Sequence, residues 1–181
     1  MRVIAGHAKG RRLFTPKTET IRPVLDQVKE AIFNILFDVT GLKVLDLFAG
    51  TGAMGIEALS RGSKEAVFVD SLKHAVQLIG KNLDTCGFAG KATVLEMSAD
   101  RAINVLSRQE KKFDLIFVDP PYQKRFVQKT LKTLAESSLF TPDTVIITEH
   151  HPKEMPGDIA GLSLTDSRKY GQTRVSFFKP K

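Results

Sequence analysis

The chain has 181 residues, a length that suits one domain built around a single core. It carries 27 lysine and arginine residues against 20 acidic residues, so its formal net charge is +7 and nucleic acid is the favoured partner. The one cysteine, Cys86, excludes a disulfide framework and a cysteine-ligated zinc site. The sequence has no apolar run typical of a signal peptide or a membrane span, and we expect a cytoplasmic protein without membrane contact.

The first 23 residues are rich in basic side chains and glycine, which predicts a basic N-terminal arm on the surface rather than a part of the core. Short apolar runs at 2–5 and 12–14 are predicted to pair as a small hairpin. Apolar residues at helical spacing then predict an amphipathic helix over 24–37. Three aromatic residues of these segments are expected in the core, namely Phe14, Phe33 and Phe37.

After Gly41, apolar runs of strand length alternate with longer segments of helical period, which is typical of parallel βαβ units. The predicted strands span 43–48, 66–70, 92–96, 114–118 and 144–149, and the predicted helices span 52–60, 72–86, 99–107 and 126–137. Two further strands, 161–166 and 173–178, have no helix between them and predict an antiparallel hairpin. The sequence therefore predicts an α/β fold, a doubly wound and mostly parallel seven-stranded Rossmann-like sheet in a single domain, 1–181, comprising the arm over 1–23 and a helix plus core over 24–181.

A glycine-rich turn lies between the first predicted strand and the next helix. Gly50, Gly52 and Gly55 have the spacing of a dinucleotide-binding fingerprint, in which glycines let the backbone approach a ligand. Asp70 ends the second strand, where a carboxylate accepts the ribose hydroxyls of a nucleotide cofactor. On these residues alone, an NAD(P)-dependent oxidoreductase is one interpretation.

Asp46, on the strand just before the turn, distinguishes two classes of cofactor. Its carboxylate would repel a pyrophosphate held in a partly desolvated site. S-adenosyl-L-methionine has no phosphate and carries an ammonium and a sulfonium group, so a nearby carboxylate favours it. The turn therefore favours this methyl donor.

The fourth predicted strand ends in Asp119-Pro120-Pro121-Tyr122, at the edge where open parallel sheets bind ligands. The two prolines have no N–H, so this loop offers hydrogen-bond acceptors. The Asp119 carboxylate and the Pro120 carbonyl could each accept one N–H of an exocyclic amine and direct its lone pair at the sulfonium methyl. Tyr122 would stack on the base without distinguishing adenine from guanine.

Together these motifs resemble the class I S-adenosylmethionine-dependent methyltransferases with an Asn/Asp-Pro-Pro-aromatic tetrad. Segments near both ends of the chain narrow the resemblance to the bacterial 16S rRNA (guanine(966)-N2)-methyltransferase family, at 2–6, 9–13, 21–23, 28–36 and 169–177. The resemblance covers essentially the whole chain. It implies a methyltransferase fold and methyl transfer to the N2 amine of guanine 966 in 16S rRNA, within an assembling 30S subunit.

The resemblance also implies roles for individual residues. Those expected to hold the methyl donor are Asp46, Gly50, Gly52 and Asp70, with Ser98 and Ala99 facing its adenine and Phe48 close to the turn. The target amine would be held by the residues from Asp119 to Tyr122. From their charge, the candidates for RNA phosphate contacts are His7, Lys9, Arg11, Arg12 and Arg22.

Other interpretations remain open at this point. A DNA adenine-N6 methyltransferase would use the same tetrad, although the core leaves no room for a sizeable target-recognition domain. A non-catalytic RNA-binding module is supported by charge alone, and the oxidoreductase by the glycine spacing. Glu149-His150-His151 does not predict a metal site, because adjacent residues on an extended segment point to opposite faces, and no metal is expected.

Overall fold

The computed structural model describes residues 1–16, 26–121 and 126–181. The strands are β1 (Lys43–Leu47), β2 (Glu65–Asp70), β3 (Ala92–Glu96), β4 (Phe113–Val118), β5 (Phe140–His150), β6 (Leu162–Tyr170) and β7 (Thr173–Pro180). The helices are α1 (Asp26–Leu36), α2 (Ala53–Ser60), α3 (Lys73–Cys86), α4 (Ala99–Arg108), α5 (Phe126–Ala135) and the short 3₁₀ helix η1 (Ala89–Lys91).

The seven strands form one sheet in the order β3-β2-β1-β4-β5-β7-β6. The first five strands are parallel, whereas β7 pairs antiparallel with both β5 and β6. This arrangement confirms the predicted α/β fold with its C-terminal antiparallel hairpin. The strand order changes direction between β1 and β4, and ligands of open α/β sheets bind at such a switch point.

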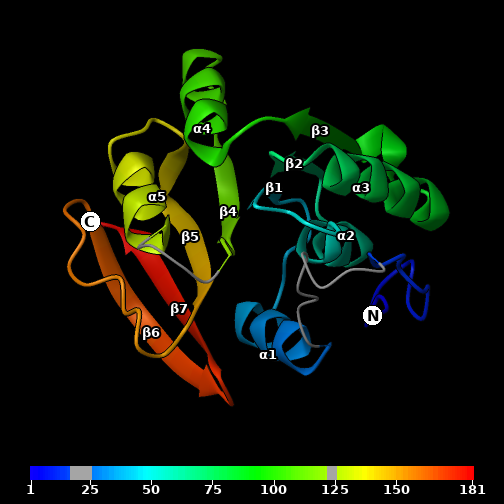
Figure 1. Cartoon of the computed structure of the whole chain (residues 1–181), viewed down its shortest axis with the longest axis horizontal. Helices are drawn as coiled ribbons and strands as arrows, with labels where there is room; N and C mark the ends of the chain where they lie inside the picture. Colours follow the sequence, from blue (N-terminus) through cyan, green and yellow to red (C-terminus); the bar gives the residue numbers. More distant parts are fainter. Residues whose placement is uncertain (17–25, 122–125) are drawn as a thin grey trace.

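Helices cover both faces of the sheet (Figure 1). On one face α1, α2 and α3 pack on side chains such as Phe68 of β2 and Phe117 of β4. On the other face α4 and α5 pack on Leu45 of β1 and Ile116 of β4. Within the described ranges, no helix is long and apolar enough to cross a membrane.

The N-terminal segment, residues 1–16, differs from the exposed arm that its charge suggests. Val3, Ala8 and Leu13 are buried at 1%, 5% and 6% exposure and belong to the core beneath α1 and α2. The expectation that this segment contributes nothing to the core is therefore wrong, because Val3, Ala8 and Leu13 turn inward between exposed basic side chains. The predicted pairing of its two runs is present as one antiparallel bridge between Arg2 and Arg12.

Only one of the three aromatic residues expected in the core lies there. Phe33 is 2% exposed, whereas Phe14 is 42% and Phe37 95% exposed. Phe37 follows the last residue of α1 and has a φ of 63°. This left-handed conformation ends the helix and directs the side chain away from the core, a reversal that apolar periodicity does not reveal.

Candidate functional site

The turn between β1 and α2 has left-handed backbone at three positions. Gly50 and Gly52 have φ values of 56° and 78°, and the non-glycine Phe48 has a φ of 63°. Left-handed backbone is easily adopted by glycine and uncommon for other residues. Strain of this kind at Phe48 is found mainly where the surrounding structure enforces it, often at ligand sites.

The N–H groups of the three fingerprint glycines are already used within the protein. Gly50 donates to Asp70 Oδ2 at 2.9 Å, and Gly55 donates to Asp46 Oδ2 at 3.0 Å. Gly52 donates to the carbonyl of Ala49 at 2.7 Å. In a dinucleotide site such N–H groups bind the pyrophosphate. Because they are donated to carboxylate and carbonyl oxygens here, the turn suits a ligand without phosphate.

Asp46 is a buried carboxyl group, 3% exposed, directly behind the turn. Burial raises its pKa to about 7, the N–H of Gly55 opposes this shift, and the charge of Asp70 adds to it. A cation bound at the turn would favour the ionised form of Asp46. This buried carboxyl group is the observation that fits S-adenosyl-L-methionine rather than a nicotinamide dinucleotide.

Gly55 allows α2 to lie unusually close to the sheet. A Cβ atom at this position would lie 2.3 Å from Cε1 of Phe68 on β2. Only glycine therefore lets the first turn of α2 approach closely enough for the Gly55 N–H to reach Asp46. The glycine spacing predicted close approach of the backbone to a ligand, and at Gly55 the close approach is to the sheet.

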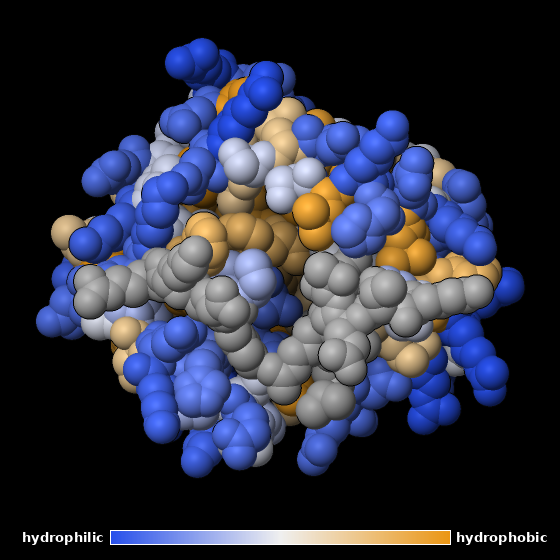
Figure 2. Space-filling view, in the orientation of Figure 1, coloured by the Kyte–Doolittle hydropathy of each residue, from blue (hydrophilic) through white to orange (hydrophobic). Residues whose placement is uncertain are grey.

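The Asp119-Pro120-Pro121 segment follows β4 beside the end of β1. Leu47 of β1 is paired with Val118 of β4, and the Asp119 N–H points at the Leu47 carbonyl with an N···O distance of 3.5 Å. Asp119 is half-buried, Pro120 is buried and Pro121 is exposed. Figure 2 shows a hollow near the centre of the drawn face, in which both apolar and hydrophilic residues are visible. The expected role of Tyr122 lies outside the described residues.

The residues proposed for the adenine side lie at the same edge of the sheet. β3 pairs with β2 up to Asp70 and Glu96, and the Met97 N–H donates to the Asp70 carbonyl at 3.0 Å. Ser98 then caps α4 by accepting the Arg101 N–H at 3.4 Å, and Ala99 is buried. The structure thus brings together at one edge the residues that follow β1, β2, β3 and β4.

The basic candidates lie on the N-terminal segment. His7, Lys9, Arg11 and Arg12 are exposed. The backbone N–H of His7 donates to the Ser60 carbonyl at 2.8 Å, which holds this part of the segment against α2. The fifth candidate, Arg22, lies outside the described residues.

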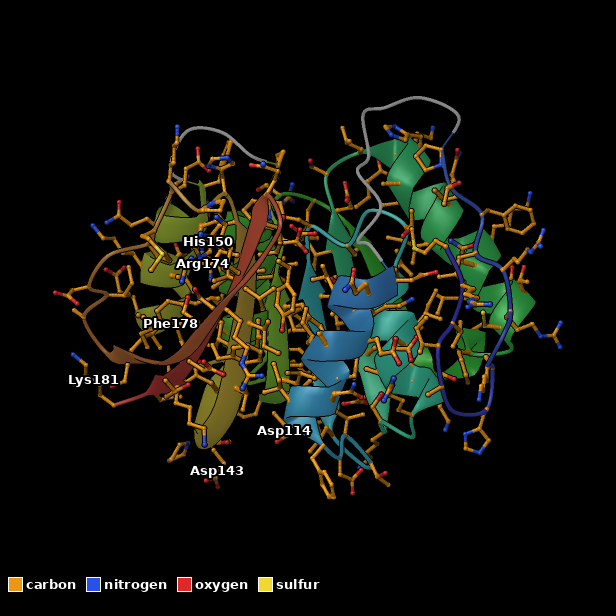
Figure 3. All side chains as sticks on the ribbon, turned by 90° about the horizontal axis from the view of Figure 1, so that it is seen from below. Asp114, Asp143, His150, Arg174, Phe178 and Lys181 are labelled. Carbon is orange, nitrogen blue, oxygen red and sulfur yellow. The ribbon has the colours of Figure 1, made fainter. Side chains whose placement is uncertain are left out.

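His150 is part of the sheet rather than of a ligand set. It is fully buried, its Nε2 lies 2.9 Å from Ser176 Oγ and its Nδ1 lies 3.0 Å from the His151 carbonyl. Burial lowers the pKa of His150. Figure 3 shows His150 and Arg174 close together, at the opposite end of the sheet from Asp114 and Asp143. Among the residues that the structure describes, no group of three or more His, Cys, Asp or Glu could hold a metal ion.

Comparison with known proteins places the chain in a family. The family described as "Conserved hypothetical protein 95" matches residues 1–179. YlbH of Bacillus subtilis is 39% identical over 185 residues, covering 100% of both chains. Ribosomal RNA small subunit methyltransferase D of Escherichia coli is 31% identical over 181 residues, covering 99% of this chain and 89% of that protein. The solved structure of yhhF from Escherichia coli superimposes with a TM-score of 0.87 at 29% identity, covering 100% and 98% of the two chains. The chain therefore belongs to the Conserved hypothetical protein 95 family, and its resemblance to the bacterial ribosomal RNA methyltransferases is confirmed.

Proposed function

We propose that this protein transfers a methyl group from S-adenosyl-L-methionine to the exocyclic N2 amine of guanine 966 in 16S rRNA, within an assembling 30S subunit. One observation carries the proposal: the turn after β1, whose flanking carboxyl groups accept the Gly50 and Gly55 N–H groups, adjoins the acceptor-lined segment after β4 at the switch point of the sheet. The name of the Escherichia coli relative supports ribosomal RNA of the small subunit as the substrate.

At the donor side, the proposed role of the protein is to bind the positively charged groups and the ribose of the methyl donor. The residues proposed to do so are Asp46, Phe48, Gly50, Gly52 and Asp70, with Ser98 and Ala99 beside the adenine. When bound, S-adenosyl-L-methionine supplies an electrophilic methyl group on its sulfonium. The buried Asp46 favours the positive charge electrostatically, and the two oxygens of Asp70 already fix the N–H groups of Gly50 and Leu72 around it.

At the acceptor side, the proposed work is orientation. The Asp119 carboxylate and the Pro120 carbonyl accept the two N–H groups of the target amine, which directs its lone pair towards the donor. Tyr122 stacks on the guanine after the base has left its own stack, an event that costs a few kcal/mol. Phosphate contacts at the basic N-terminal residues help to offset this cost, and their proposed members are His7, Lys9, Arg11, Arg12 and Arg22.

A transfer assay with labelled S-adenosyl-L-methionine tests this function on undermodified 30S particles and on naked 16S rRNA, followed by identification of the methylated nucleoside. We expect N2-methylguanosine as the product and more transfer on particles. Asp119→Ala should abolish transfer while leaving donor binding nearly intact, because Asp119 lies on the acceptor side. Unchanged turnover in that variant would remove Asp119 from the mechanism, and N6-methyladenine as the product would favour an adenine methyltransferase.

A further inference from the structure

One buried side chain joins the glycine turn to the N-terminal segment. Asn82, on α3, has no exposed surface. Its Nδ2 donates to the carbonyl of Thr51 in the turn at 2.9 Å and to the carbonyl of Phe14 at 3.1 Å. Its Oδ1 accepts the N–H of Phe14 at 2.7 Å. Asn82 therefore fixes both backbone groups of Phe14 and one backbone group of the turn with a single rigid amide.

Thr51 makes a second contact with the N-terminal segment. Its hydroxyl donates to the Met1 sulfur at 3.6 Å, and the residue is 4% exposed. Lys81, the neighbour of Asn82, places its ammonium 3.6 Å from the centre of the Phe14 ring. The turn and the segment thus meet at several points, and Asn82 contributes three hydrogen bonds to this junction.

The middle of the same segment is attached to the C-terminal half of α2. The fully buried Glu57 accepts the N–H groups of Ile4 and Ala5 at 2.8 and 3.0 Å, and its charge is balanced by Arg61 at 2.8 Å and Lys29 at 3.5 Å. Ser60 Oγ accepts the Ala8 N–H at 2.9 Å. Because α2 begins at the turn, one helix carries the turn at its start and the N-terminal segment at its end.

Building on the function proposed above, we propose that Asn82 is a positioning residue that couples RNA contact at the N-terminal segment to donor binding at the glycine turn. Phosphate contacts at Arg11 and Arg12 favour the docked segment, in which Phe14 holds Asn82 in place. Asn82 in turn holds Thr51 in the conformation that the donor requires. Linkage makes the effect reciprocal, so the donor strengthens RNA binding by the same factor.

Calorimetric titration with S-adenosyl-L-homocysteine tests this coupling, without RNA and with a saturating transcript of small-subunit rRNA. In the wild type we expect RNA to raise the affinity at least about fivefold, the lower end of typical coupling. The ratio that matters is the affinity with RNA divided by the affinity without RNA. Asn82→Ala should bring this ratio close to one. Thr144→Ala is the control, because it also removes a buried hydrogen bond, from Thr144 Oγ1 to the Phe113 carbonyl at 2.7 Å, outside the segment and the turn. An unchanged ratio in Asn82→Ala, or an equal loss in Thr144→Ala, would overturn the proposal.

A second pair of variants leaves Asn82 intact. Gly6 and Gly10 have φ values of 80° and 83°, so alanine is similarly strained at both. A Cβ at Gly6 would lie 1.8 Å from the Ser60 carbonyl oxygen, whereas nothing lies within 4 Å of one at Gly10. Gly6→Ala should therefore displace the segment and lower the ratio, and Gly10→Ala should keep it. Equal ratios in the two variants would contradict the coupling.

The same titrations separate this inference from the proposed function. Absence of binding to the wild type in the titration without RNA would refute the proposed donor site. Binding with a ratio of one would refute the coupling and leave the donor site supported. Thermal unfolding of each variant without ligand shows whether a lost ratio accompanies loss of the fold.

Discussion

Asp46→Asn separates the charge of this buried carboxyl group from its hydrogen bond, because the amide oxygen can still accept the Gly55 N–H. Burial raises the pKa of Asp46 from 3.8 to about 7. Between these values the unfolded chain loses the proton while the folded chain keeps it, so rising pH destabilises the fold. The wild type should lose up to about 4 kcal/mol relative to the variant over this window, at about 1.36 kcal/mol for each pKa unit.

Urea unfolding of both proteins at pH 5, 6, 7 and 8 measures the part of this loss between pH 5 and 7, about 3 kcal/mol at about 1.36 kcal/mol for each of two pKa units. The difference in unfolding free energy between variant and wild type should grow as the pH rises to 7 and change little above it. Other titrating groups are shared by the two proteins and cancel in the difference. A difference that stays constant from pH 5 to pH 8 would refute the raised pKa of Asp46.

The same group should control donor binding with the opposite pH dependence. If the ionised carboxylate is the form that binds the cationic donor, about half of the protein is competent at pH 7 and about a tenth at pH 6, which weakens apparent binding about fivefold. Asp46→Asn should bind the donor more weakly at pH 7 and without this dependence. Calorimetric titrations that find the same pH dependence in both proteins would contradict the proposed role of Asp46.

Gly55→Ala places a methyl group 2.3 Å from Phe68 Cε1, so we expect a loss of about 1–3 kcal/mol in unfolding free energy together with weaker donor binding. In Gly80→Ala on α3, the added Cβ meets nothing within 4 Å, so this variant should gain roughly 0.5–1 kcal/mol in unfolding free energy. Urea unfolding that finds the same change in unfolding free energy for both variants would argue against the close packing of α2. Replacing Arg11 and Arg12 together by Ala should reduce the slope of log RNA affinity against log salt concentration by about 1.4, at about 0.7 for each single-strand phosphate contact. A slope that does not change in binding titrations would show that neither residue contacts phosphate.

Most of the fold could be predicted because parallel strands covered on both faces are continuous apolar runs, which differ clearly from helical periods. The start of β5 was missed: the strand begins at Phe140, and the first expected residue was Thr144. The intervening Thr141-Pro142-Asp143 has no apolar pattern, and the pairing with β4 shifts register between Phe113 and Leu115. Irregular pairing of this kind depends on the neighbouring strand and leaves no local signal.

The residues that hold the site together were harder to predict than the motifs themselves. The glycine turn and the Asp119-Pro120-Pro121 segment are contiguous in sequence and have recognisable spacing. Asn82 and Glu57 are polar residues in helices, and each has a hydrogen-bond partner on the N-terminal segment, 68 and 53 residues away. Local patterns assign such residues to the exposed face of a helix. Their burial follows from the docking of the N-terminal segment. The positive charge of that segment had predicted an exposed surface arm instead.

The turn after β1 has the glycine spacing of a dinucleotide site but a different set of hydrogen-bonding groups beside it. The glycines set the backbone path, but the residues at the strand ends decide what the turn presents to a ligand. Here Asp70 on β2 accepts the Gly50 N–H of the turn, and Asp46 on β1 accepts the Gly55 N–H in the first turn of α2, so carboxyl oxygens take up N–H groups that a dinucleotide site would offer to its ligand. Each carboxyl group therefore occupies an N–H donor that a phosphate would need, and under the proposed function its ionised form would favour a cationic donor. Glycine spacing should accordingly be interpreted together with the acidic residues of the two strands that flank it.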